Sequence, residues 1–131
     1  MSSPHFLRDA FVACKPDIVI NCIAERRVDV CESQWSQCME VNVNIPMRLA
    51  QLCEEFAIYF IQISTDYVFD GETNLSYSED DFTSPIGDYG ESKLKGEELA
   101  LEINPKTIIL RTSWLYSEFN KNFVKYCFKC F

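Results

Sequence analysis

The chain has 131 residues, 47% of them hydrophobic, which is enough for one core, so we expect a single partial domain over residues 1–131. Its formal net charge of −8 argues against a nucleic-acid partner, because phosphate backbones are bound by clustered Lys and Arg. With no run of eighteen apolar residues and no signal-peptide pattern at its start, we expect a cytoplasmic protein without a membrane partner.

Short runs rich in Ile and Val alternate with amphipathic segments along the chain. Strands are expected at residues 17–22, 58–63 and 107–110, and helices at 5–14, 34–56 and 85–103. The strands lack polar alternation, which is typical of parallel strands covered on both faces. The order therefore predicts an α/β fold with right-handed crossovers. An acidic, turn-rich segment at 70–84 predicts a surface loop.

The seven cysteines lie at positions 14, 22, 31, 38, 53, 127 and 130. Their number is odd, and several fall inside apolar helix or strand patterns, so we expect all of them to be reduced. The C-x-x-C motif of Cys127 and Cys130 has no second pair, and the chain contains a single histidine. No metal site is therefore expected.

Polar residues follow each predicted strand, where the carboxyl ends of parallel strands gather ligand-binding groups. Cys22-Ile23-Ala24 follows the first strand, Ser64-Thr65 the second, and Thr112-Ser113-Trp114 the third. Tyr89 and Lys93 are four residues apart on a predicted helix, so they share a face, and the ammonium can favour the ionised phenol. Such a set can protonate a ketone oxygen.

Several of these residues also have structural interpretations. Thr65 can close the turn after its strand, and Trp114 can belong either to the core or to a ligand site. Asn42 is expected to pin a helix bend or local backbone. Arg26 and Arg27 can reach phosphates, although an adjacent pair on an acidic protein is more typical of a solvated rim.

Four runs together resemble the dTDP-4-dehydrorhamnose reductase family of the extended short-chain dehydrogenase/reductases. They span residues 15–22, 63–71, 89–97 and 111–116. The resemblance implies a partial Rossmann-like doubly wound parallel sheet of about three strands with flanking helices. It also implies NADPH- or NADH-dependent reduction of a 4-keto-6-deoxy sugar nucleotide.

The resemblance also implies a role for each site residue. Thr65 would hold the substrate carbonyl and Tyr89 would donate the proton. Lys93 would lower the pKa of the tyrosine and bind the nicotinamide ribose, beside a cofactor channel lined by the backbone of Cys22-Ile23-Ala24. Trp114 would stack on the substrate sugar or its nucleotide.

A second interpretation comes from a subgroup of the same family, the regulatory beta subunit of methionine adenosyltransferase. That subgroup carries a run similar to residues 24–30 after the corresponding strand. It implies a non-catalytic module whose partner is a catalytic methionine adenosyltransferase subunit, whereas a homodimer is the other partner we consider. The run at 111–114 is more similar to the bacterial sugar-nucleotide reductases.

The glycines mark a departure from the family pattern. The family holds the cofactor pyrophosphate in a G-x-x-G-x-x-G loop, because a side chain would block close backbone approach. The four glycines of this chain are Gly71, Gly87, Gly90 and Gly96. We therefore expect the glycine-rich half of the fold to be missing, a strand edge and apolar helix faces to be exposed, and turnover by these residues to be negligible.

Overall fold

The computed structural model describes residues 4–119 and 125. Its centre is a parallel sheet in the order β1-β2-β3, formed by β1 (Ile18–Asn21), β2 (Tyr59–Thr65) and β3 (Thr107–Thr112). Each strand overlaps its predicted range, so the parallel α/β fold expected from the sequence is confirmed. All three strands point the same way, and their carboxyl ends therefore meet at one edge.

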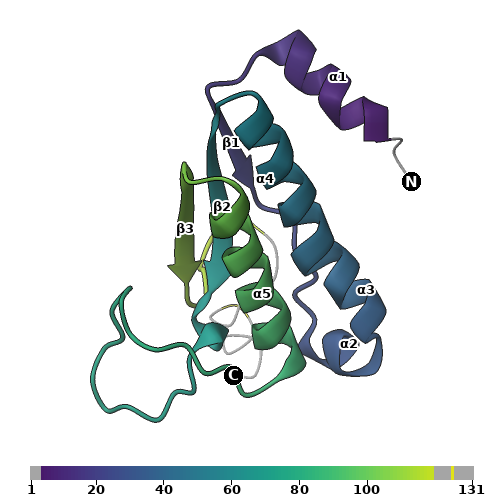
Figure 1. Cartoon of the computed structure of the whole chain (residues 1–131). Coiled ribbons are helices and arrows are strands. Elements are labelled where there is room, and N and C mark those ends of the chain that lie inside the picture. Colours follow the sequence, from purple (N-terminus) through teal and green to yellow (C-terminus); the bar gives the residue numbers. More distant parts are fainter. Residues whose placement is uncertain (1–3, 120–124, 126–131) are drawn as a thin grey trace.

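Helices connect the strands and cover one face of the sheet. They are α1 (Pro4–Cys14), α2 (Val28–Ser33), α3 (Trp35–Met39), the π-helix η1 (Glu40–Asn44), α4 (Ile45–Glu55), the 3-10 helix η2 (Asp66–Val68) and α5 (Asp88–Ile103). Figure 1 shows α4 and α5 side by side in front of the sheet, with α1 at its opposite end from η2. The segment at 70–84 forms a loop that projects away from the sheet, as predicted.

The helix predicted over residues 34–56 is confirmed, because α3, η1 and α4 follow one another without a break from residue 35 to residue 55, with a wider π-helical turn at η1. Helix α2 was not predicted, and the non-helical backbone of Gln34 separates it from α3. Pro46 accounts for the widening, since it has no N–H to donate to the carbonyl of Asn42. That carbonyl instead faces helix α5, where a Cβ on Gly96 would lie 2.2 Å from it.

The expectation that every cysteine is reduced is wrong, because a buried disulfide joins Cys31 of α2 to Cys38 of α3. In a continuous helix, residues seven apart are separated by about 10 Å along the axis, which is too far for a disulfide. The break at Gln34 turns α3 back on α2 and brings the two Cα atoms to 5.1 Å. Cys127 and Cys130 lie outside the described residues.

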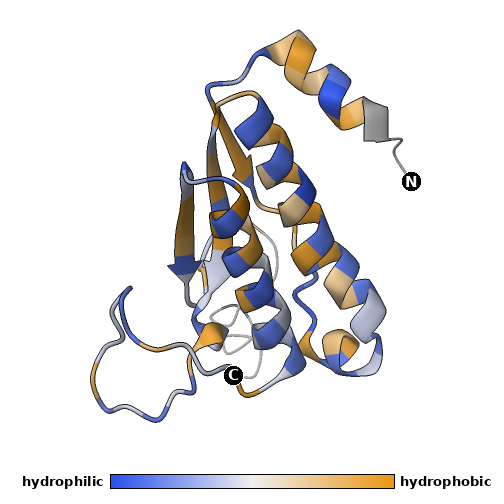
Figure 2. Ribbon diagram, in the orientation of Figure 1, coloured by the Kyte–Doolittle hydropathy of each residue, from blue (hydrophilic) through white to orange (hydrophobic). Residues whose placement is uncertain are grey.

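The core fills the space between the sheet and its helices. Its buried residues come from α1, α4, α5, β2 and the residue before β2: Phe11, Leu49, Ala50, Cys53, Ile58, Phe60 and Ala100. Burial raises the pKa of the Cys53 thiol to about 11. Figure 2 shows the apolar strands behind the two amphipathic helices.

The opposite face of the sheet is apolar and exposed within the described ranges. Exposed side chains on that face include Ile18, Ile20, Tyr59, Ile108 and Leu110, each between 45% and 59% accessible. Strands covered on both faces were expected, so that prediction is wrong for the described part of the chain. Exposed apolar residues on the helices, which were predicted, are found at Phe6, Val12 and Leu101.

Candidate functional site

A cavity of about 540 Å³ opens at the carboxyl ends of the three strands. Loops after β1, β2 and β3 and the first half of α5 all contribute to its wall. The structure brings together most of the residues selected from the sequence: Cys22, Ala24, Thr65, Tyr89, Lys93 and Trp114. Ile23 is absent from the wall and is 56% exposed.

Thr65 ends β2 and caps the short helix η2. Its hydroxyl accepts a hydrogen bond from the Tyr67 N–H at 3.3 Å and donates one to an Asp66 carboxylate oxygen at 3.2 Å. The turn-closing interpretation of Thr65 is therefore correct, while the residue also lines the cavity. Beside it, Ser64 carries a buried hydroxyl oxygen without a hydrogen-bond partner in the described part of the protein.

Tyr89 lies on the first turn of α5. Its ring and the ring of Tyr67 pack edge to face, with their centroids 5.5 Å apart. Burial raises its pKa above the ordinary value, and a side-chain hydrogen bond with Thr65 opposes this rise without cancelling it. This direction is opposite to the one expected from Lys93. The ammonium of Lys93 donates to the Ile63 carbonyl at 2.8 Å, so its charge is directed at β2.

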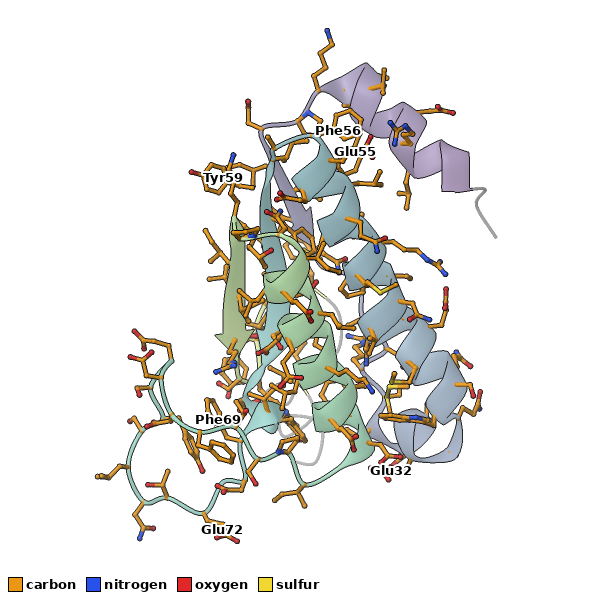
Figure 3. The ribbon with its side chains drawn as sticks, in the orientation of Figure 1. Glu32, Glu55, Phe56, Tyr59, Phe69 and Glu72 are labelled. Carbon is orange, nitrogen blue, oxygen red and sulfur yellow. A yellow bond between two sulfur atoms is a disulfide. The ribbon has the colours of Figure 1, made fainter. Side chains whose placement is uncertain are left out.

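Helix α5 approaches the loop after β2 closely because of Gly90. A Cβ at this position would lie 2.3 Å from the carbonyl oxygen of Tyr67, so any side chain would push the helix away from the cavity. The helix is also fastened at its start, where the Asp88 N–H donates to Glu32 of α2 at 3.1 Å. Figure 3 shows Glu32 below the first turn of α5.

Asn42 links the loop after β1 to α5. Its amide nitrogen donates to the carbonyl of Glu25 at 3.0 Å and to the hydroxyl of Ser92 at 3.0 Å, and its oxygen accepts from the Glu25 N–H at 2.8 Å. Ser92 in turn donates to the Tyr89 carbonyl at 2.8 Å. The prediction that Asn42 pins local backbone is confirmed, and the network holds two walls of the cavity together.

Three further wall residues, Asp66, Tyr67 and Ser113, follow the strands as well, although no chemical role was assigned to them from the sequence. The two arginines behave differently, since Arg26 lines the cavity and Arg27 forms an ion pair with Glu25 at 2.6 Å. Arg26 lies a few residues beyond the end of β1, and this position in the sequence is what indicated that it could reach the site. Trp114 is 53% exposed and lines the cavity, so it is not a core residue.

The arrangement supplies a phenol, a hydroxyl and an ammonium around a cavity open to a small molecule, which suits proton transfer to a carbonyl oxygen. Across residues 4–119 and 125, no cluster of three His, Cys, Asp or Glu side chains could hold a metal ion. None of the helices in the same ranges is long and apolar enough to cross a membrane.

Comparison with known proteins shows related reductases and a related subunit of methionine adenosyltransferase. The chain is 49% identical over 100 residues to a probable low-salt glycan biosynthesis reductase of Haloferax volcanii, covering 76% of this chain and 33% of that protein. It is 43% identical over 107 residues to the methionine adenosyltransferase 2 subunit beta of Rattus norvegicus, covering 82% of this chain and 32% of that protein.

Among solved structures, dTDP-4-dehydrorhamnose reductase of Bacillus anthracis in complex with NADP superposes with a TM-score of 0.92 at 32% identity. The match covers 98% of this chain and 46% of that one, so the chain spans from about a third to just under half of the length of these relatives. The family model for the RmlD substrate-binding domain matches residues 1–130. The chain therefore belongs to the RmlD substrate-binding domain family.

Proposed function

We propose that residues 1–131 form a single partial domain of an NAD(P)H-dependent reductase acting on a 4-keto-6-deoxy sugar nucleotide. The observation that carries this proposal is the meeting of Thr65, Tyr89 and Lys93 in one cavity, although they come from different elements. The similarity to dTDP-4-dehydrorhamnose reductase supports the substrate class.

The cavity fits the nicotinamide end of a cofactor, NADPH or NADH, better than the pyrophosphate end. Cys22 and Ala24 offer a small, largely apolar wall opposite the polar groups of Tyr89 and Lys93. No glycine precedes Gly71 in the sequence, so these residues offer no glycine-rich cradle for phosphates. A bound nicotinamide would supply a hydride to the carbonyl carbon of the sugar.

The side chains of this chain would then position the carbonyl and supply the proton. Tyr89 donates its phenolic proton to the carbonyl oxygen, and its raised pKa keeps it protonated in the resting site. The Thr65 hydroxyl orients the same oxygen. Lys93 holds the nicotinamide ribose and stabilises the phenolate left after proton transfer, while Trp114 packs on the sugar or its base.

Titration of the purified chain with NADPH, followed by fluorescence, tests this proposal before any turnover is sought. We expect saturable binding in the micromolar range, and a loss of at least tenfold in affinity in Lys93→Met, because a charged contact to the ribose is removed. Lys95→Met is the matched control, since Lys95 lies on the exposed face of the same helix and should leave the affinity unchanged.

A folded chain that binds neither NADPH nor NADH would overturn the cofactor part of the proposal. We expect negligible turnover from these 131 residues alone, so binding is the decisive measurement. Where a longer form turns over substrate, Tyr89→Phe should abolish the activity, and Tyr59→Phe, at the opposite end of β2, should not.

The similarity to the rat methionine adenosyltransferase subunit supports a second candidate, a non-catalytic module that binds a catalytic methionine adenosyltransferase subunit. The two candidates differ in what co-purifies. A stable complex with a catalytic methionine adenosyltransferase subunit, formed equally by wild type and Lys93→Met, would favour the regulatory module. A homodimer that binds NADPH would favour the reductase.

A further inference from the structure

A buried acid lies one helical turn beyond Lys93. Glu97 is 1% exposed, and both of its oxygens accept hydrogen bonds from the guanidinium of Arg111 on β3, the shortest at 2.7 Å. Arg111 also lies over the ring of Phe69 at 5.2 Å. This pair therefore joins α5, β3 and the segment that follows η2.

Residues four apart on a helix share a face, so Glu97 lies on the Lys93 side of α5. Lys93 is 4% exposed, and its ammonium hydrogen bonds to the carbonyl of Ile63, which is a neutral partner. Burial lowers the pKa of Lys93, and the charge of Glu97 acts against that effect. The carboxylate thus compensates part of the cost of burying an ammonium.

Other charged and titratable groups line the same cavity as Lys93. They are Tyr89 on α5, Cys22 and Arg26 after β1, and Asp66 and Tyr67 after β2, while Arg111 on β3 lies outside the cavity and pairs with Glu97. Of these groups, Asp66 is the one with a carboxylate. Removal of Glu97 would leave the partly buried Arg111 without its carboxylate partner and the buried Lys93 without the charge that offsets its burial.

We propose that Glu97 is a positioning residue of the site: its carboxylate balances the charge of Lys93 and, through Arg111, fixes α5 against the end of β3. Its importance for catalysis rests on the proposed reductase function. The charge coupling between Glu97 and Lys93 is a property of the fold and does not require that function.

The test is an NMR titration of the chain labelled with 13C-lysine, in which the Lys93 resonance is assigned by its loss in Lys93→Met. We expect Glu97→Gln to move the Lys93 titration midpoint down by about one pH unit, as for the removal of a nearby opposite charge. Glu98→Gln, which removes the same charge from the adjacent exposed position, should leave the midpoint in place.

Two further variants separate charge from packing. Glu97→Asp keeps the charge in a shorter side chain and should hold the midpoint nearer to that of wild type than the isosteric Glu97→Gln does. Arg111→Gln frees the carboxylate from its cation and should move the midpoint up, so the proposal stays testable if Glu97→Gln does not fold. An unchanged midpoint in the folded variants overturns it. If the Lys93 midpoint moves in Glu97→Gln but the chain does not bind NADPH, the charge coupling is supported and only the reductase proposal is overturned.

Discussion

At the scale of single residues, the candidate site depends on buried polar groups that are held by hydrogen bonds. Glu25 is such a group in the loop after β1, where it is 8% exposed. Its carboxylate accepts hydrogen bonds from the backbone N–H of Arg27 at 3.0 Å and from the guanidinium of Arg27 at 2.6 Å. These bonds hold the pKa of Glu25 at about 2, below the ordinary 4.5.

The lowered pKa of Glu25 leads to a prediction for acid stability. Because the folded state favours the carboxylate, its contribution is fully present above pH 4.5 and is lost as the pH falls through about 2. Glu25→Gln should therefore lower the free energy of unfolding at pH 7, and the difference from wild type should shrink toward pH 2. Urea unfolding at both pH values measures this difference in the free energy of unfolding. Glu102→Gln, at an exposed position, is the control. An equal deficit at pH 7 and pH 2 would contradict the assignment.

The sequence was sufficient to select Thr65, Tyr89 and Lys93, because strand ends and a four-residue spacing place them without tertiary information. It was not sufficient for Glu97 and Arg111. Their pairing is a contact between α5 and β3, and neither has a short-range pattern that distinguishes it from a solvated charge. The raised pKa of Tyr89 was missed for the same reason, since it comes from burial in the folded chain.

At the scale of elements, the strands followed from runs of Ile and Val and the helix over residues 34–56 from its apolar spacing, whereas the π-helical turn η1 and the separate helix α2 did not follow from the sequence. Pro46 was visible in the sequence, but its effect depends on Gly96 of α5 leaving room for the freed carbonyl of Asn42. The break at Gln34 could not be predicted, because no Gly or Pro lies at that position. Since the disulfide forms across this break, its pairing could not be predicted either.

The disulfide between α2 and α3 should contribute to stability by restricting the unfolded chain. For the short loop closed by Cys31 and Cys38, loop-closure entropy corresponds to about 2 kcal/mol. We expect the chain refolded under reducing conditions to unfold at a lower urea concentration. Its free energy of unfolding should be smaller by that amount. The Cys31→Ala/Cys38→Ala double variant should not respond to reductant, and Cys14→Ala, at an exposed free thiol, should respond as wild type does. Identical transitions of wild type with and without reductant would contradict this prediction.

At the scale of the whole molecule, the sheet is asymmetric in the described ranges, with two helices on one face and apolar side chains exposed on the other. The register places Ile20, Ile61 and Ile108 next to one another across β1, β2 and β3. The neighbouring row contains Ile18 and Tyr59, and Tyr59 projects from the start of β2 in Figure 3. These rows form one continuous apolar surface.

An exposed apolar surface of this kind favours association in water, because it removes apolar area from solvent. We therefore expect the purified chain to self-associate with increasing concentration, and the double variant Ile20→Lys/Ile108→Lys to weaken that association at least tenfold without loss of helix content. Sedimentation velocity over a concentration series measures it. Leu75→Lys is the matched control, because Leu75 is 82% exposed in the loop that projects away from the sheet. Association that persists in the double variant, or that disappears in Leu75→Lys, would place the contact elsewhere on the molecule.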